Sequence, residues 1–145
     1  HHTVPISMLY AIYEGLRVVL EEGLKARFER HRLNATALRA GLEALGLEII
    51  SDKDHRLSQI TPVAIPEGVD DAKVRSRLTN HYNIEISRGL GKFAGKIWRI
   101  GLMGEASTAG NVMFLLSALE KILPQEGYEV PVGAGVAAAS KALSS

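Results

Sequence analysis

The sequence predicts an α+β domain in which two long N-terminal helices precede a β-β-α-β-β-α layer, a small sheet covered by helices on one face. Two observations predict this class. Apolar residues recur every three or four positions through the first third of the chain, as in amphipathic helices. The middle then changes to short β-branched runs bounded by turn residues, as in strands. The length of 145 residues suits one domain with its own core.

Composition excludes several classes of protein. The 17 basic and 16 acidic residues give a formal charge of +1, so we expect no nucleic-acid partner. The absence of cysteine excludes disulfides, thiol nucleophiles and thiolate metal sites. No apolar run approaches the ~20 residues of a membrane span, so we expect no membrane segment. The sequence begins at His1 rather than at methionine, which indicates a piece of a longer protein or a tag remnant.

The first third of the chain predicts two helices. Pro5 suits a first helical turn because its missing N–H would be unpaired there. The first apolar stripe comprises Ile6, Leu9, Tyr13, Leu16 and Leu20. Gly23 interrupts it, and the sequence leaves open whether this glycine ends a helix or bends one. The second stripe comprises Leu24, Phe28, His31, Ala35, Leu38, Leu42 and Leu45, with Gly46 placed as a left-handed cap.

The middle of the chain predicts four strands and a helix. The strands are expected at residues 47–51, 60–65, 84–86 and 96–102. Pro62 favours an edge strand or a bulge, since it cannot donate to a ladder. Asp70 is the expected cap of a helix whose apolar stripe contains Val74 and Leu78, and Asn83 is a plausible left-handed stop.

The last third predicts one helix at residues 108–123, ended by Pro124. Its inward residues are expected to be Val112, Leu115, Leu119 and Ile122. Residues 133–145 are small and alanine-rich, and they are compatible with a short helix or with a frayed end.

The strand at 96–102 is the segment that best indicates chemistry. Alternation places Trp98, Ile100 and Leu102 on the core face, and Arg99 beside Gly101 on the other. A guanidinium next to a residue without a side chain suits bidentate binding of a carboxylate or phosphate. A solvated arginine on an outer sheet face is the alternative. The glycines around this strand favour the binding interpretation, because they permit close backbone approach.

The sequence does not support a dinucleotide-binding, metal, serine-nucleophile or covalent lysine site. The run 89–95 has Ala94 where a dinucleotide fingerprint needs its third glycine, and a strand follows it instead of a helix. The five histidines show no i, i+4 pair, so no metal site is expected, and His31 is interpreted as a hydrogen-bonded core or rim residue. No serine has the glycine pattern of a nucleophile elbow. No lysine lies in an apolar run that would lower its pKa for covalent chemistry.

Three segments resemble a known family. Residues 1–5 (HHTVP), 89–91 (GLG) and 95–104 (GKIWRIGLMG) are similar to the C-terminal part of alanine–glyoxylate and serine–glyoxylate aminotransferases. These are class V aminotransferases of pyridoxal-phosphate fold type I. The resemblance covers nearly the whole chain and fades over about the last twenty residues. It implies a helical connection over residues 1–28, the C-terminal small domain over 29–124 and a small-residue tail over 125–145.

The resemblance also implies roles for individual residues. Arg99 would bind the substrate α-carboxylate, and Thr3 would reach the phosphate of pyridoxal phosphate in the other subunit of a homodimer. The family's cofactor-bonding lysine lies upstream, so no catalytic residue is expected among these 145, and the isolated chain is expected to be inactive. The pair Ser87-Arg88 is bulkier and more charged than expected beside the glycine run, which leaves the local substrate preference open.

The resemblance thus predicts a cytoplasmic homodimeric transaminase that moves an amino group from alanine or serine to glyoxylate. Glycine and either pyruvate or hydroxypyruvate would be its products. The cytoplasm is expected because the C-terminal Leu143-Ser144-Ser145 is not a peroxisomal Ser-Lys-Leu signal. The alternative is a stand-alone ferredoxin-like regulatory module that binds a small molecule through Arg99. A third interpretation, an interaction domain, takes the apolar stripes of residues 6–45 as a partner surface.

Overall fold

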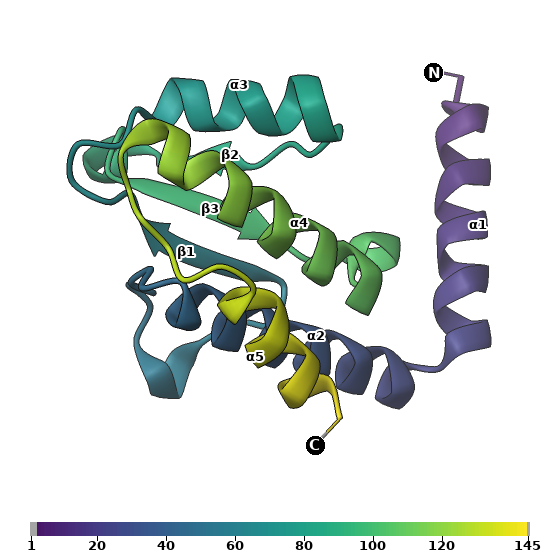
Figure 1. Ribbon diagram of the computed structural model, residues 1–145. Coiled ribbons are helices and arrows are strands. Elements are labelled where there is room, and N and C mark those ends of the chain that lie inside the picture. The colour runs from purple at the N-terminus through teal and green to yellow at the C-terminus, as the bar shows by residue number, and fades with distance from the viewer. Residues whose placement is uncertain (1–2, 145) are drawn as a thin grey trace. The chain divides into compact units, whose positions relative to one another are not determined.

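The computed structural model describes residues 3–144 and divides the chain into two compact units, residues 1–30 and 31–145 (Figure 1). Helix α1 spans Ile6–Glu22 and helix α2 spans Leu24–Ala44. Between them Gly23 adopts φ +81°, and its N–H donates to the Val19 carbonyl at 3.0 Å. This glycine therefore ends α1, which answers the question that the sequence left open.

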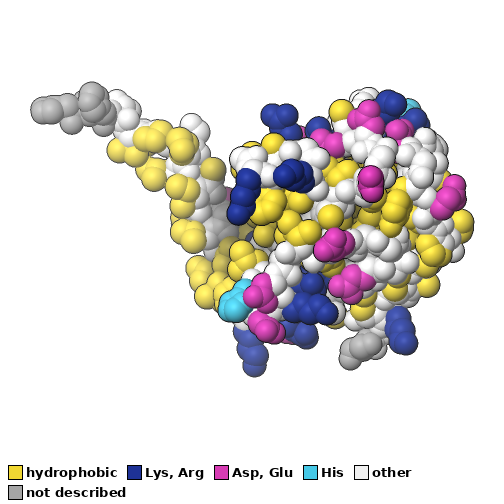
Figure 2. All heavy atoms as spheres, turned by 90° about the vertical axis from the view of Figure 1, so that its left-hand side faces the viewer, with side chains coloured by type: hydrophobic (Ala, Val, Ile, Leu, Met, Phe, Trp, Pro, Cys, Tyr) yellow, Lys and Arg dark blue, Asp and Glu magenta, His cyan; other side chains and the backbone are white. Residues whose placement is uncertain are grey.

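Helix α1 has apolar side chains without cover in its own unit. All its residues are exposed or half-buried, and Figure 2 shows apolar side chains gathered along it. On its charged side Arg17 pairs with Glu14, at 2.8 Å from Nε to Oε2, and with Glu21. The stripe predicted from the sequence is thus a surface of the kind that proteins bury against other protein. Among residues 3–144, no helix is both long and apolar enough to span a bilayer.

Three antiparallel strands form the sheet in the second unit: β1 (Ile60–Ala64), β2 (Ser87–Arg88) and β3 (Ile97–Gly101). Their order is β1-β3-β2, so β3 is central. Pro62 lies on β1 at an edge of this sheet, which confirms the position expected for it.

The predictions of strands at residues 47–51 and 84–86 are wrong. Residues 47–51 make only the bridge between Ile49 and Val63, although the Ile50 N–H donates to the Pro62 carbonyl at 3.2 Å. Pro62 has no N–H to return to the Ile50 carbonyl, so the ladder stops on that side of the bridge. On the other side the Ala64 N–H donates to the Glu48 carbonyl at 2.9 Å. Residues 84–86 lie before β2, because the Ile84 N–H donates to the Leu78 carbonyl at 3.1 Å and closes the preceding helix.

The start expected after Asp70 and the left-handed stop expected at Asn83 are confirmed. Helix α3 (Asp71–Tyr82) begins after Asp70, which accepts the Lys73 N–H at 3.1 Å, and ends at Asn83 with φ 53°. Helix α4 (Ala109–Ile122) begins after Thr108, whose hydroxyl accepts the Asn111 N–H at 3.1 Å. Short 3-10 turns lie at Lys53–His55, Gly91–Phe93, Gly104–Ala106 and Leu123–Glu126.

The C-terminal segment forms helix α5 (Ala134–Leu143), one of the two outcomes left open. The carboxylate of Glu120 on α4 accepts the N–H groups of Gly133 at 2.9 Å and of Gly135 at 3.0 Å. A negative group at a helix N-terminus satisfies otherwise unpaired donors. Gly41 on α2 lets the elements approach closely, since a Cβ there would lie 2.9 Å from the Gly135 carbonyl oxygen. Residue Ala139 is fully buried.

One face of the sheet carries the core, which confirms the α+β class. The core joins the sheet to the described helices of the second unit through Leu38, Leu42, Val63, Val74, Leu78, Trp98, Ile100, Val112, Leu115, Leu116 and Leu119. Figure 1 shows α3 and α4 lying along the sheet. On β1 buried and half-buried residues alternate, so the opposite face is only partly covered. Arg99 lies on that second face.

Truncation of a core residue tests this packing. Leu116 is fully buried in α4, so Leu116→Ala is expected to lower the free energy of unfolding by about 2–5 kcal/mol. The matched control is Leu57→Ala, because Leu57 is 63% exposed and its loss should change stability by about 0.5 kcal/mol or less. Urea denaturation of the two variants measures both values. Equal effects would contradict the described core.

Candidate functional site

Arg99 lies at the centre of the sheet among neighbours that cannot neutralise it. On β3 it pairs with Pro62 of β1 and with Ser87 of β2. Directly opposite residues in an antiparallel sheet share a face, so these two side chains flank the arginine. The next residue on that face is Gly101, where an added Cβ would meet only the Met103 side-chain terminus, at 3.2 Å. On this side the space beside Arg99 is therefore bordered by the flexible end of the Met103 side chain.

The hydrogen-bond pattern of the sheet fixes one atom of Arg99. The Gly89 N–H donates to the Ile97 carbonyl at 2.9 Å, and ladder bonds alternate along antiparallel strands. The carbonyl of Arg88, one residue earlier, is therefore directed out of the ladder. It accepts the Nε–H of Arg99 at 2.9 Å. Within residues 3–144 the two terminal guanidinium nitrogens have no hydrogen-bond or ion-pair partner, so the fork that they form together stays available.

Arg88 belongs to the opposite face of the sheet. Successive residues of a strand alternate, and Arg88 pairs with Trp98, whose indole Nε1–H donates to Asp71 Oδ1 at 2.9 Å. Asp71 also accepts two hydrogen bonds from Arg75, at 2.8 and 3.0 Å. The Arg75 guanidinium holds the pKa of Asp71 below its ordinary value, and Trp98 and the charge of Arg88 act in the same direction, while burial opposes them. The positive charge of Arg88 therefore acts on Asp71, on the face of the sheet opposite Arg99.

The glycine run before β3 folds tightly against the strand at Gly89. At Gly89 an added Cβ would lie 2.0 Å from the carbonyl oxygen of Phe93, so no larger residue fits without moving backbone. The same position lies 2.8 Å from Ile97 Cγ1, and Ile97 is buried although it shares a face with Arg99. The turn therefore covers the sheet beside Arg99 and leaves the arginine itself half-buried.

Buried polar groups hold the turn after β3. His31 on α2 is 6% exposed, and its Nε2 accepts the Gly104 N–H at 3.1 Å. The Asn34 side chain donates to the Ser107 carbonyl at 2.8 Å. The interpretation of His31 as a hydrogen-bonded core residue is confirmed. These contacts hold the end of β3, and no spacing pattern in the sequence indicates them.

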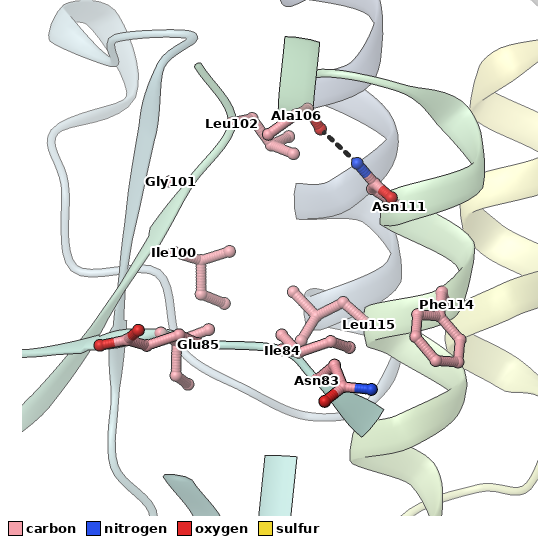
Figure 3. A pocket seen from close by; sticks show the side chains of 11 residues that line it. Asn83, Ile84, Glu85, Ile100, Gly101, Leu102, Ala106, Asn111, Phe114 and Leu115 are labelled. Atoms are coloured by element: carbon pink, nitrogen blue, oxygen red, sulfur yellow. Dashed lines mark hydrogen bonds between the residues drawn. The ribbon is translucent and has the colours of Figure 1, made fainter. Parts of the chain in front are cut away.

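A hollow of about 230 Å³ lies on the helical side of the sheet (Figure 3). Its walls come from residues 83–86, β3 and α4, and Arg99 is not among them. Figure 3 shows the Glu85 carboxylate directed away from the apolar side chains. The Asn111 amide is already used, since it donates to the Ala106 carbonyl at 2.9 Å. The hollow thus offers apolar contact and little chemistry.

The described residues fit only a peripheral part of a pyridoxal-phosphate site. All seven lysines are exposed, so none has the desolvated surroundings that favour covalent bonding to the cofactor. Thr3 is exposed and carries a hydroxyl that suits a phosphate oxygen, whereas His1 and His2 of the same motif lie outside the described residues. Within residues 3–144 no group of three or more histidine, aspartate or glutamate side chains could hold a metal ion.

Comparison with known proteins gives a consistent result. The chain is 45% identical over 139 residues to (S)-ureidoglycine–glyoxylate transaminase of Bacillus subtilis, covering 96% of the chain and 33% of that protein. It is 42% identical to alanine–glyoxylate aminotransferase of Callithrix jacchus, covering 85% and 30%. It is 36% identical to serine–glyoxylate aminotransferase of Arabidopsis thaliana, covering 98% and 35%. No family model matches the chain.

Solved structures agree with the described fold. The crystal structure of ureidoglycine–glyoxylate aminotransferase from Bacillus subtilis superposes with a TM-score of 0.95 at 43% identity, over 100% of this chain and 38% of that one. Alanine–glyoxylate aminotransferase from Nostoc gives 0.81 at 46% identity, over 85% and 33%. The predicted resemblance is confirmed: the chain is homologous to glyoxylate aminotransferases, and it spans about a third of the length of the curated relatives it matches.

Removal of the Asp71 carboxylate tests the support of β3. Asp71→Ala leaves the buried Trp98 indole N–H without its acceptor, so we expect a loss of about 1–3 kcal/mol in unfolding free energy. Asp71→Asn keeps an acceptor oxygen, so its free energy of unfolding should fall less than that of Asp71→Ala.

The same residue gives a pH dependence. Because the pKa of Asp71 is lowered on folding, its contribution is present above the unfolded pKa of about 3.9 and is lost as pH falls through the lower folded value. Urea denaturation between pH 2 and 7 measures it. An acid slope identical in wild type and Asp71→Asn would contradict this role.

Proposed function

We propose that this chain is the C-terminal domain of a pyridoxal-phosphate-dependent aminotransferase that moves an amino group from a small amino acid to glyoxylate. With alanine or serine as donor, the products are glycine and pyruvate or hydroxypyruvate. Relatives named for alanine, serine and ureidoglycine donors support the common acceptor, glyoxylate. The observation that carries the proposal is Arg99, anchored at Nε, open at its terminal nitrogens and opposite an uncharged residue on each neighbouring strand.

In this proposal Arg99 binds the α-carboxylate of each substrate in turn. A guanidinium fork matches the two oxygens of a carboxylate, and the anchored Nε limits the rotation of the side chain. Amino donor and keto acceptor both carry a carboxylate next to the reacting carbon, so one clamp serves both halves of the reaction. Holding that end fixed orients the reacting carbon, which lowers the entropic part of the barrier.

The cofactor is held mainly by residues outside this chain. Pyridoxal phosphate, when bound, supplies the electron sink for amino transfer. We assign to Thr3 the donation of a hydroxyl hydrogen to the cofactor phosphate of the partner subunit in a homodimer. The homodimer, the cytoplasmic location and the division at residues 28/29 and 124/125 stay predictions. The alternative of a stand-alone regulatory module is not favoured, because the curated relatives are aminotransferases about three times as long.

Arg99→Ala in the full-length subunit tests the clamp. Removing one partner of a charged hydrogen-bonded pair costs ~2–5 kcal/mol, so kcat/KM for amino donor and for glyoxylate should each fall about 30- to 5,000-fold. Arg99→Lys keeps the charge without the planar fork and should recover only part of the loss. Steady-state kinetics with both substrates measure this.

A matched control is Arg32→Ala, an exposed arginine on α2. It should leave kcat/KM near the wild-type value. Wild-type kcat/KM in Arg99→Ala would refute the proposed function.

Thr3→Val tests the cofactor contact. It removes the hydroxyl with little change in shape, and loss of a hydrogen bond to a charged phosphate should raise the Kd for pyridoxal phosphate by about tenfold or more. The control is Thr36→Val, an exposed threonine whose hydroxyl donates to the Arg32 carbonyl at 2.9 Å. Titration of the apo full-length enzyme with the cofactor measures both constants. Equal constants in Thr3→Val and wild type would remove Thr3 from the site.

A further inference from the structure

Ser87 is the polar residue placed nearest to the proposed clamp by the sheet itself. It lies directly opposite Arg99 on the neighbouring strand, so the two side chains emerge on the same face with Cβ atoms about 5 Å apart. Ser87 is exposed, and within residues 3–144 its hydroxyl has no hydrogen-bond partner. Its donor is therefore available to a ligand on that face.

The anchor of Arg99 brings the guanidinium to the side of Ser87. The Arg88 carbonyl that accepts the Nε–H is directed away from β3, beyond β2. To reach it, the arginine side chain crosses β2 on the face that Ser87 shares. The other cross-strand neighbour, Pro62, lies on the opposite side of β3 and carries no polar hydrogen.

Arg88 does not compete for a ligand on this face. Its side chain emerges on the face of Trp98, and its charge acts on Asp71. The unusual pair Ser87-Arg88 thus divides between the two faces of the sheet. It gives the Arg99 side a neutral hydroxyl without a second cation.

We propose that Ser87 is a substrate-binding residue that donates its hydroxyl hydrogen to the carboxylate held by Arg99. This inference rests on the proposed function of Arg99. A carboxylate has about four lone-pair positions, and a bidentate guanidinium uses two, so a third donor is chemically matched. The carboxylate does not react, and the contact therefore holds ground state and transition state equally. Such a residue sets KM and leaves kcat nearly unchanged.

Ser87→Ala in the full-length enzyme tests this role. We expect KM for glyoxylate and KM for the amino donor each to rise about tenfold, with kcat within about twofold of wild type. The competitive inhibition constant of propanoate, which has a carboxylate but no amino group, should rise by the same factor. Ser87→Thr keeps the hydroxyl on a strand-compatible residue and should restore all three constants. The matched control is Ser76→Ala, an exposed serine on α3.

The outcomes separate this inference from the proposed function. If Arg99→Ala loses activity while Ser87→Ala keeps wild-type KM and propanoate inhibition, Ser87 has no role and the clamp stands. If Arg99→Ala itself keeps activity, the proposed function fails first. A fall in kcat of Ser87→Ala with unchanged KM would also overturn the inference, since that pattern belongs to a residue acting on the reaction step. The inference is supported if Ser87→Ala raises both KM values and the propanoate inhibition constant by similar factors, and if Ser87→Thr restores all three.

Discussion

The hydrogen bond from Arg99 Nε to the Arg88 carbonyl is the contact on which the functional account depends. It is possible because antiparallel ladders leave every second carbonyl of an edge strand unpaired. That carbonyl is neutral, so it orients the guanidinium without cancelling its charge. The arginine is thereby fixed at one nitrogen and open at two, an arrangement that a carboxylate partner within the domain would have destroyed. The backbone of β2 thus prepares a cationic site at little electrostatic cost.

The rest of the second unit supports the strand that carries this arginine. Trp98, beside Arg99, fills the core and donates to Asp71, so the strand is held on its covered face by packing and by a hydrogen bond. His31 and Asn34 hold the turn that follows β3. The tight turn at Gly89 closes the other end. Burial on one face and openness on the other make the site precise and accessible.

Much of this domain could be predicted from local sequence signals. The cap at Asp70, the stop at Asn83 and the core face of residues 96–102 follow from rules that act within a few residues. The failures involve distant partners. Residues 47–51 look like a strand, but the residue opposite Ile50 is Pro62, which cannot complete the ladder. The state of residues 133–145 stayed open for the same reason, because the N-terminus of α5 is held by Glu120, more than ten residues away. Ser87 could not be identified as a candidate from the sequence, because only the strand register places it opposite Arg99.

The chain spans about a third of the length of its curated relatives. The decisive measurement is a crystal structure of the full-length protein with propanoate bound. We expect both carboxylate oxygens within hydrogen-bond distance of the terminal nitrogens of Arg99, with Nε still on the Arg88 carbonyl. A carboxylate bound elsewhere, with Arg99 paired to an acidic side chain of the full-length protein, would contradict it.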